Sequence, residues 1–240
     1  FMTATLNFSI DRTDKIISLK QELEKLEIPF LKPDINFSEE KFIIEKNKSK
    51  KSIRFGLSAI KGVGSKSIKS VVLVREQNGK FKSINDFLKR VNPKDINKLQ
   101  LEGLVKAGAF DKIFNNRKVL FNNIPNIIQN SKTVYENKLQ NQSSLFSEES
   151  QKVSYLIQDK NTSNWSNDEI LSKEFESVGF YISDHPLKSY EDILEQYKVK
   201  SFKDFENNIE NEGLIAGTIM SVKEKKTSKG TSFAIVKFSD

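Results

Sequence analysis

The chain has 240 residues, is 37% hydrophobic and 30% charged, and carries a formal net charge of +7. This length suits one or two domains with connecting segments. The chain has no cysteine and one histidine, which excludes disulfides, thiolate metal sites, cysteine nucleophiles and multi-histidine metal sites. No apolar run approaches the ~20 residues that cross a bilayer, and no signal-peptide pattern opens the chain. We therefore expect a soluble, cytoplasmic protein without a membrane partner.

The N-terminal segment predicts a helix followed by extended chain. Asp11 is placed to cap a helix that runs to about Glu27, with apolar residues at helical spacing. Pro29 and Pro33 then impose an extended connector. Residues 34–38 have turn chemistry.

Two short strands with a lysine-rich tip are predicted next, at residues 42–44 and 52–55. The tip either touches a partner or is an ordinary solvated loop, and we leave both readings open. Positive charge is concentrated here: residues 41–90 contain 14 Lys and Arg against three acidic residues, a local net charge of +11 in a chain of +7. Such a concentration is typical of a surface that binds nucleic acid.

A glycine-built turn follows the second strand. A short apolar helix through Leu57 should end at Gly62, because glycine adopts the left-handed conformation without a Cβ penalty. Val63 then returns to the core, Gly64 permits a sharp turn, and a second helix begins near Ser65. This pattern resembles the hairpin of a helix-hairpin-helix DNA-binding module.

The hairpin predicts a phosphate-binding site. The first amides of the second helix have no intrahelical acceptor, and the helix dipole adds partial positive charge there. Lys61, Lys66 and Lys69 add long-range attraction to duplex DNA. The alternative is structural, namely a helix C-cap followed by a new helix.

Capping signals define the helices that follow. Asn78 and Gly79 predict a turn, and Ser83 has an acidic residue three positions later, as in a capping box. Asn92 and Pro93 predict an N-cap followed by the first residue of another helix.

That helix ends at Gly108, where we interpret the sequence as a second, degenerate hairpin with one glycine instead of two. Its claim to bind phosphate is therefore the weaker of the two, and Lys106, Lys112 and Arg117 are its candidate backbone contacts. A further helix over about residues 116–132 closes the module.

Residues 136–165 are polar and predict a linker. Within it, Gln142 is followed by two serines and then by Leu145 and Phe146. This is the form of a peptide that docks bacterial proteins onto the sliding clamp, with the two apolar side chains entering a groove. The alternative is that Leu145 and Phe146 attach the linker to a neighbouring domain.

Beyond the linker, Ser166 opens a second capping box and its helix should close at Gly179. We interpret His185, which precedes a proline, as a turn residue and not as a catalytic base. A helix is predicted over residues 187–197. From residue 212 the apolar period switches to two, which predicts two strands.

Three stretches, FGLSAIKGVG, LEGLVKAGAFD and ESVGFYISDHPL, resemble the C-terminal half of the alpha subunit of bacterial DNA polymerase III. The resemblance covers essentially the whole chain. It departs from the family at Asp184, where glycine is usual, and in a longer basic insertion around residues 46–51.

The resemblance implies a mainly α fold: a tandem helix-hairpin-helix module with flanking helices and a partial OB-fold. It implies that the chain is a fragment without the catalytic aspartates and their Mg²⁺, which in the family lie in an upstream palm domain. The fragment should then be inactive alone and hold no cofactor, with other replicase subunits as further partners. The implied domains are 1–50 (end of the fingers), 51–135 (hairpin module), 136–165 (linker), 166–210 (helical connector) and 211–240 (first OB-fold strands).

The hypotheses from sequence are therefore a DNA-holding, clamp-docking part of a replicative polymerase, a free-standing helix-hairpin-helix adaptor of repair or recombination, or a module that only joins domains. No residue is assigned to catalysis or to a metal. The candidate clamp-binding residues are Gln142, Leu145 and Phe146. The candidate DNA-binding residues are Lys61, Gly62, Val63, Gly64, Ser65, Lys66, Lys69, Lys106, Gly108 and Arg117.

Overall fold

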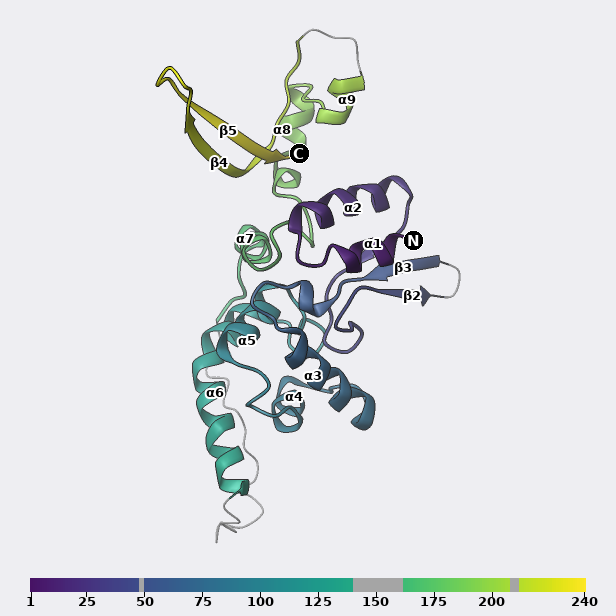
Figure 1. Ribbon diagram of the computed structural model, residues 1–240, viewed down its shortest axis with the longest axis vertical. Coiled ribbons are helices and arrows are strands. Elements are labelled where there is room, and N and C mark those ends of the chain that lie inside the picture. Colours follow the sequence, from purple (N-terminus) through teal and green to yellow (C-terminus); the bar gives the residue numbers. More distant parts are fainter. Residues whose placement is uncertain (48–49, 140–161, 208–211) are drawn as a thin grey trace. The chain divides into compact units, whose positions relative to one another are not determined.

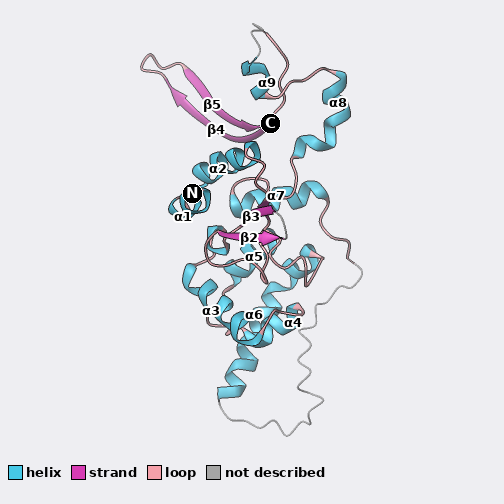
Figure 2. Cartoon of the chain, turned by 90° about the vertical axis from the view of Figure 1, so that its right-hand side faces the viewer, coloured by secondary structure: helices cyan, strands magenta, loops and turns pink. Residues whose placement is uncertain are grey.

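The computed structural model describes residues 1–47, 50–139, 162–207 and 212–240 (Figure 1). Their internal contacts divide them into two units, Phe1–Ile182 and Ser183–Asp240. Helices predominate and two small sheets accompany them (Figure 2). This confirms the predicted mainly α fold class. None of the helices within the described ranges has the length and apolar character needed to cross a membrane.

The N-terminal segment forms two helices where one was predicted. α1 spans Met2–Phe8 and α2 spans Thr13–Lys25. The prediction that Asp11 caps the helix was wrong, because the N-cap of α2 is Arg12. Leu6 in α1 and Leu23 in α2 are both fully buried in one core. A break between the helices thus lets each of them bury an apolar side chain.

A three-stranded sheet has the order β1-β3-β2, formed by β1 (Phe30–Leu31), β2 (Ile43–Asn47) and β3 (Lys50–Arg54). β2 and β3 are antiparallel, which confirms the two predicted strands. β1 pairs parallel to β3, in the segment that was predicted only to be extended. Residues 48–49 of the lysine-rich tip lie outside the described residues.

The hairpin module follows the sheet. Its elements are η1 (Leu57–Ala59), α3 (Ser65–Asn78), α4 (Ile84–Arg90), α5 (Lys98–Lys106) and α6 (Arg117–Leu139). The short helix predicted before Gly62 is only the 3-10 turn η1. Ser83 caps α4 as predicted. Asn92 and Pro93 do not begin α5; residues 93–95 form a turn, and Asn97 caps α5 through a capping box with Gln100.

Phenylalanine rings fill much of the core of the first unit, Phe1–Ile182. Neighbouring rings lie 5.0 to 6.1 Å apart, centroid to centroid, at separations suited to edge-to-face and offset packing. One group is Phe30, Phe42, Phe55 and Phe180, and the other is Phe81, Phe87 and Phe110. The first group joins the sheet to Phe180, so residues far apart in sequence share one core.

α7 (Asn167–Val178) confirms both of its predicted ends. Ser166 caps it through a capping box with Glu169, and Gly179 closes it in the left-handed conformation, at φ +86°. Trp165, just before the cap, is buried against Phe121 of α6, with 5.5 Å between the ring centroids. α7 is thereby fixed to the hairpin module.

The second unit contains η3 (Pro186–Tyr190), α8 (Glu191–Gln196), α9 (Phe202–Asn207), β4 (Thr218–Lys226) and β5 (Ser232–Ser239). The helix predicted over 187–197 is divided between η3 and α8. His185 caps η3, accepting a hydrogen bond from Leu187 N, in keeping with a turn residue. β4 and β5 pair as an antiparallel hairpin, so the two predicted strands are confirmed. Completion of an OB-fold stays a prediction.

Candidate nucleic-acid interface

The first hairpin has the backbone that its sequence predicts. Gly62 lies in the left-handed region at φ +76°, where a side chain would be strained. Val63 is 5% exposed and packs in the core, whereas Gly62 and Gly64 lie at the surface. Gly64 has φ −75° and ψ 139°, which any residue adopts. The turn is present as predicted, but its backbone at Gly64 does not require glycine.

α5 and α7 support the hairpin on its buried side. Gly103 of α5 packs against it so closely that a Cβ there would lie 3.1 Å from Lys61 O and 3.2 Å from Val63 Cγ2. From α7, Ser177 O accepts a hydrogen bond from Lys61 N at 2.8 Å. These contacts fix the hairpin backbone while its outer side stays open. The sequence signal for Gly103, a lone glycine in a helical pattern, was available but had no assigned role.

The first turn of α3 faces solvent. Among the described residues, no side chain caps this helix end, and Ser65 and Lys66 are exposed. An open groove borders the turn, lined by residues 58–64, by Gln100, and by Ile10, Asp11 and Thr13. The amides of a helix N-terminus, beside an exposed lysine, present donors to an anion.

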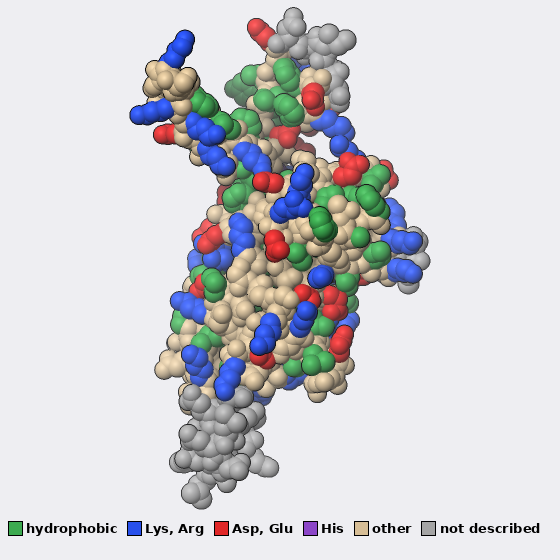
Figure 3. Space-filling model, viewed as in Figure 1, with side chains coloured by type: hydrophobic (Ala, Val, Ile, Leu, Met, Phe, Trp, Pro, Cys, Tyr) green, Lys and Arg blue, Asp and Glu red, His purple; other side chains and the backbone are tan. Residues whose placement is uncertain are grey.

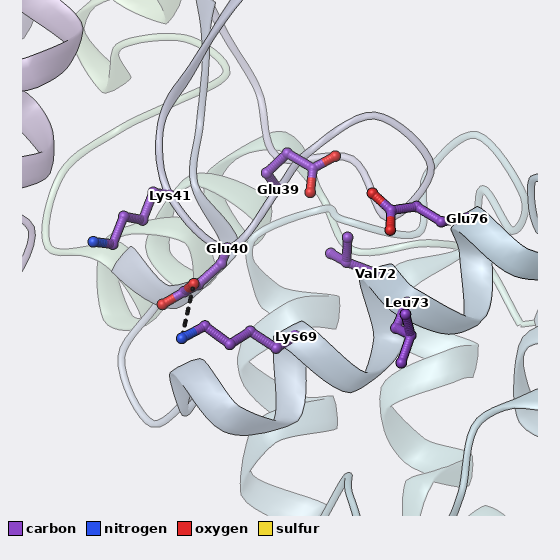
Figure 4. A pocket seen from close by; sticks show the side chains of 7 residues that line it. All are labelled: Glu39, Glu40, Lys41, Lys69, Val72, Leu73 and Glu76. Atoms are coloured by element: carbon purple, nitrogen blue, oxygen red, sulfur yellow. Dashed lines mark ion pairs between the residues drawn. The ribbon is translucent and has the colours of Figure 1, made fainter.

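Glu40 lies beside this helix end, which the sequence did not indicate. Its carboxylate accepts a hydrogen bond from Ser65 Oγ and pairs with Lys69, 3.5 Å from Nζ to Oε2 (Figure 4). The bond from Ser65, followed by the charge of Lys69, lowers the pKa of Glu40 against the opposing effect of burial. Two predicted phosphate ligands, Ser65 and Lys69, are therefore already engaged by an internal anion.

The second hairpin is closed. Gly108 has φ +77° but is buried, and the guanidinium of Arg117 covers it. Arg117 is 5% exposed and donates to Asp111 and to Glu174, which is itself fully buried. These two positions correct the prediction for Gly108 and Arg117, because neither offers a surface to a phosphate. Lys106 is mostly buried and pairs with Glu176, 2.6 Å from Nζ to Oε1.

The start of α6 is capped as well. Asn116 Oδ1 accepts from Val119 N at 3.0 Å, and Asn164 Oδ1 accepts from Lys118 N at 3.3 Å. Carboxamide oxygens thus occupy the donors that an anion would use at this helix end. Of the two predicted hairpins, only the first keeps an uncapped helix start among the described residues.

The charge count from sequence overstates the free positive charge. Arg54, Arg75 and Arg90 all form salt bridges, with Glu45, Glu39 and Asp86 respectively. Lys61 and Lys66 remain exposed at the hairpin. On the face drawn in Figure 3, blue basic side chains spread over the helical module with red acidic ones among them. The attraction for an anion at the hairpin therefore comes from a few lysines.

The candidate clamp-binding residues Gln142, Leu145 and Phe146 lie in 140–161, outside the described residues.

A braced, exposed glycine hairpin before an uncapped helix defines the class of this module. Residues 27–120 match the family model of the helix-hairpin-helix motif, so the predicted motif is confirmed.

The chain is also similar to curated proteins over most of its length. The chain is 35% identical over 246 residues to DNA polymerase III subunit alpha of Campylobacter jejuni, a match of 100% of this chain and 20% of the relative. It is 32% identical over 266 residues to the same subunit of Rickettsia prowazekii, a match of 95% of this chain and 22% of the relative. It is 35% identical over 199 residues to that of Borreliella burgdorferi, a match of 82% of this chain and 17% of the relative. The chain is thus homologous to one part of DNA polymerase III subunit alpha and spans about a fifth of the length of these relatives.

Proposed function

We propose that this chain is the duplex-holding part of a bacterial replicative DNA polymerase, and that the first hairpin binds the DNA backbone without reading sequence. One observation carries the proposal: the turn from Gly62 to Lys66 is braced, exposes all of its residues except Val63, and ends in an uncapped helix start. Phosphate contacts from backbone amides and lysines position a protein on DNA but carry no sequence information.

The similarity over the whole chain favours the polymerase over a free-standing repair adaptor. In this proposal DNA synthesis, with its Mg²⁺, belongs to the intact polymerase, in the cytoplasm and with other replicase subunits. In the described residues no group of three or more His, Asp or Glu side chains is placed to hold a metal ion. The proposal assigns DNA holding to this chain and no catalytic residue.

A salt titration of duplex binding tests the hairpin. Lys61→Gln/Lys66→Gln should weaken binding similarly for duplexes of unrelated sequence, and should lower the slope of log K against log salt by about 1 to 2. The matched control is Lys25→Gln/Lys132→Gln, which removes the same charge from exposed positions on α2 and α6. If both double variants lose the same duplex affinity, Lys61 and Lys66 contribute only general electrostatic attraction and the hairpin is not a specific contact. Salt-independent binding of the unchanged chain would refute the proposal.

We also propose that Gln142, Leu145 and Phe146 dock the chain on the sliding clamp. The support is the motif itself, in a polar stretch that connects α6 to α7. Leu145→Ala/Phe146→Ala should abolish co-purification with a purified bacterial clamp and leave duplex binding intact. Leu156→Ala/Ile157→Ala removes two apolar side chains from the same stretch and serves as the control. Retained clamp binding by the first variant would return these residues to a structural role.

A further inference from the structure

Away from the first hairpin, cations from three parts of the chain converge on the ring of Phe37. Lys80 Nζ lies 3.7 Å and Lys112 Nζ lies 4.5 Å from the ring centroid. Arg54 Cζ lies 5.8 Å from it. Because both distances are measured to the same centroid, the two ammonium nitrogens lie within about 8 Å of each other. We call Phe37, Lys80 and Lys112 the Phe37 cluster.

The fold, and not chance side-chain placement, brings this cluster together. The side chain of Asn36 accepts from Phe81 N at 2.7 Å and donates to Phe81 O at 2.8 Å. This exchange holds Lys80, the preceding residue, beside the ring. Ile35 N donates to Ala109 O at 2.8 Å, which ties the same turn to the segment that carries Lys112. Both lysines thus reach the ring from anchored backbone.

The charges of the cluster are only partly compensated. Lys112 pairs with Asp34, 3.1 Å from Nζ to Oδ2, and Arg54 pairs with Glu45. Lys80 is exposed and, among the described residues, has no carboxylate partner. The lysine side chain of Lys112 is 62% exposed even though it is paired. Two exposed ammonium groups near one ring repel each other, and the ring attracts each of them only weakly at an exposed site. An incoming anion would relieve that repulsion.

We propose that Lys80 and Lys112 bind a backbone phosphate of duplex DNA, as a second contact point beyond the first hairpin. This rests on the proposed function, since the hairpin supplies the first point. α3 separates the two points and has 14 residues, so it is about 21 Å long at its helical rise. That span corresponds to roughly six base pairs along a duplex. Contact with Phe37 favours side-chain conformations that keep the ammonium groups beside the ring, so less conformational freedom remains to be lost on binding.

The test is a salt titration with the full chain and a duplex of about 20 base pairs, long enough for both points. Lys80→Gln/Lys112→Gln should weaken binding about tenfold near 0.1 M salt and lower the salt slope by about 1. Lys80→Arg/Lys112→Arg keeps both charges and the contact with the ring, and should bind like the unchanged chain. Lys25→Gln/Lys132→Gln again controls for net charge.

The outcomes separate this inference from the function on which it rests. If Lys61→Gln/Lys66→Gln weakens binding but Lys80→Gln/Lys112→Gln behaves as the charge control does, the cluster is not a contact and the hairpin proposal stands. If the unchanged chain fails to bind duplex DNA, the proposed function is itself refuted, and the inference with it. If the arginine variant binds as poorly as the glutamine variant, the loss is one of structure and the cluster is refuted as a phosphate site.

Discussion

Alanine substitutions at the two glycines of the first hairpin should have opposite effects on stability. Gly62→Ala places a side chain at φ +76°, in a region that costs an L-residue about 1–2 kcal/mol. Its Cβ would also lie 3.0 Å from Leu99 Cγ, although Leu99 is 61% exposed and free to shift. Gly64→Ala meets ordinary backbone angles, and the loss of unfolded-chain freedom favours it by about 0.4–1 kcal/mol. Its nearest contact is Gln100 Nε2 at 3.4 Å.

The two variants should therefore differ by about 2 kcal/mol in the free energy of unfolding. Urea denaturation followed by tryptophan fluorescence measures this, because Trp165 is the single tryptophan and is buried in the unit that contains the hairpin. Equal losses for the two variants would refute the reasoning, as would a neutral Gly62→Ala. Gly64→Ala is consequently the better variant for DNA binding, since it alters the hairpin surface without straining its backbone.

Three further predictions follow from side-chain pairs. Arg117→Leu leaves the fully buried Glu174 without its cation and should cost about 3–5 kcal/mol of unfolding free energy; in the same urea assay, a loss below about 1 kcal/mol would contradict the buried pair. Glu40→Gln should strengthen duplex binding because it frees Lys69, whereas Glu76→Gln, further along α3, should change it less; equal gains would mean general charge alone. The lowered pKa of Glu40 means that its stabilising effect is present above its usual pKa of 4.5 and is lost as the pH falls through the lowered value. Glu40→Gln should accordingly flatten that part of the acid unfolding curve, and an unchanged curve would count against the interaction with Ser65.

Local signals explain the parts of the fold that sequence predicted well. Two helix-end signals depend only on residues within one helical turn. These are a glycine at a left-handed position and a serine with an acidic residue three positions later, so Gly62, Gly179 and Ser166 were placed correctly. The same reasoning failed where two local signals competed. Asn92 and Asn97 both suit an N-cap, and only Asn97 has a glutamine three residues on that completes a capping box.

Whether each hairpin is open to solvent or closed could not be predicted from neighbouring residues, because residues distant in sequence decide it. The second hairpin is closed by Glu174, which lies 57 residues from its partner Arg117. The first is braced by Ser177 O and flanked by Glu40. A sequence shows that acids and bases are available but not which of them meet, so both turns were predicted to be phosphate sites, the second as the weaker of the two.

Three arginines are built into the interior, and their placement has a chemical reason. Arg54, Arg75 and Arg117 are all at most 8% exposed in their side chains and each faces at least one carboxylate. The planar guanidinium satisfies several acceptors at once, which suits it to the interior. Lysine is a strongly hydrated point charge on a flexible stem, and Lys61 and Lys66 stay exposed. These arginines therefore help to build the module, whereas exposed lysines such as Lys61 and Lys66 remain to attract a phosphate backbone, and point charges of that kind do not distinguish one DNA sequence from another.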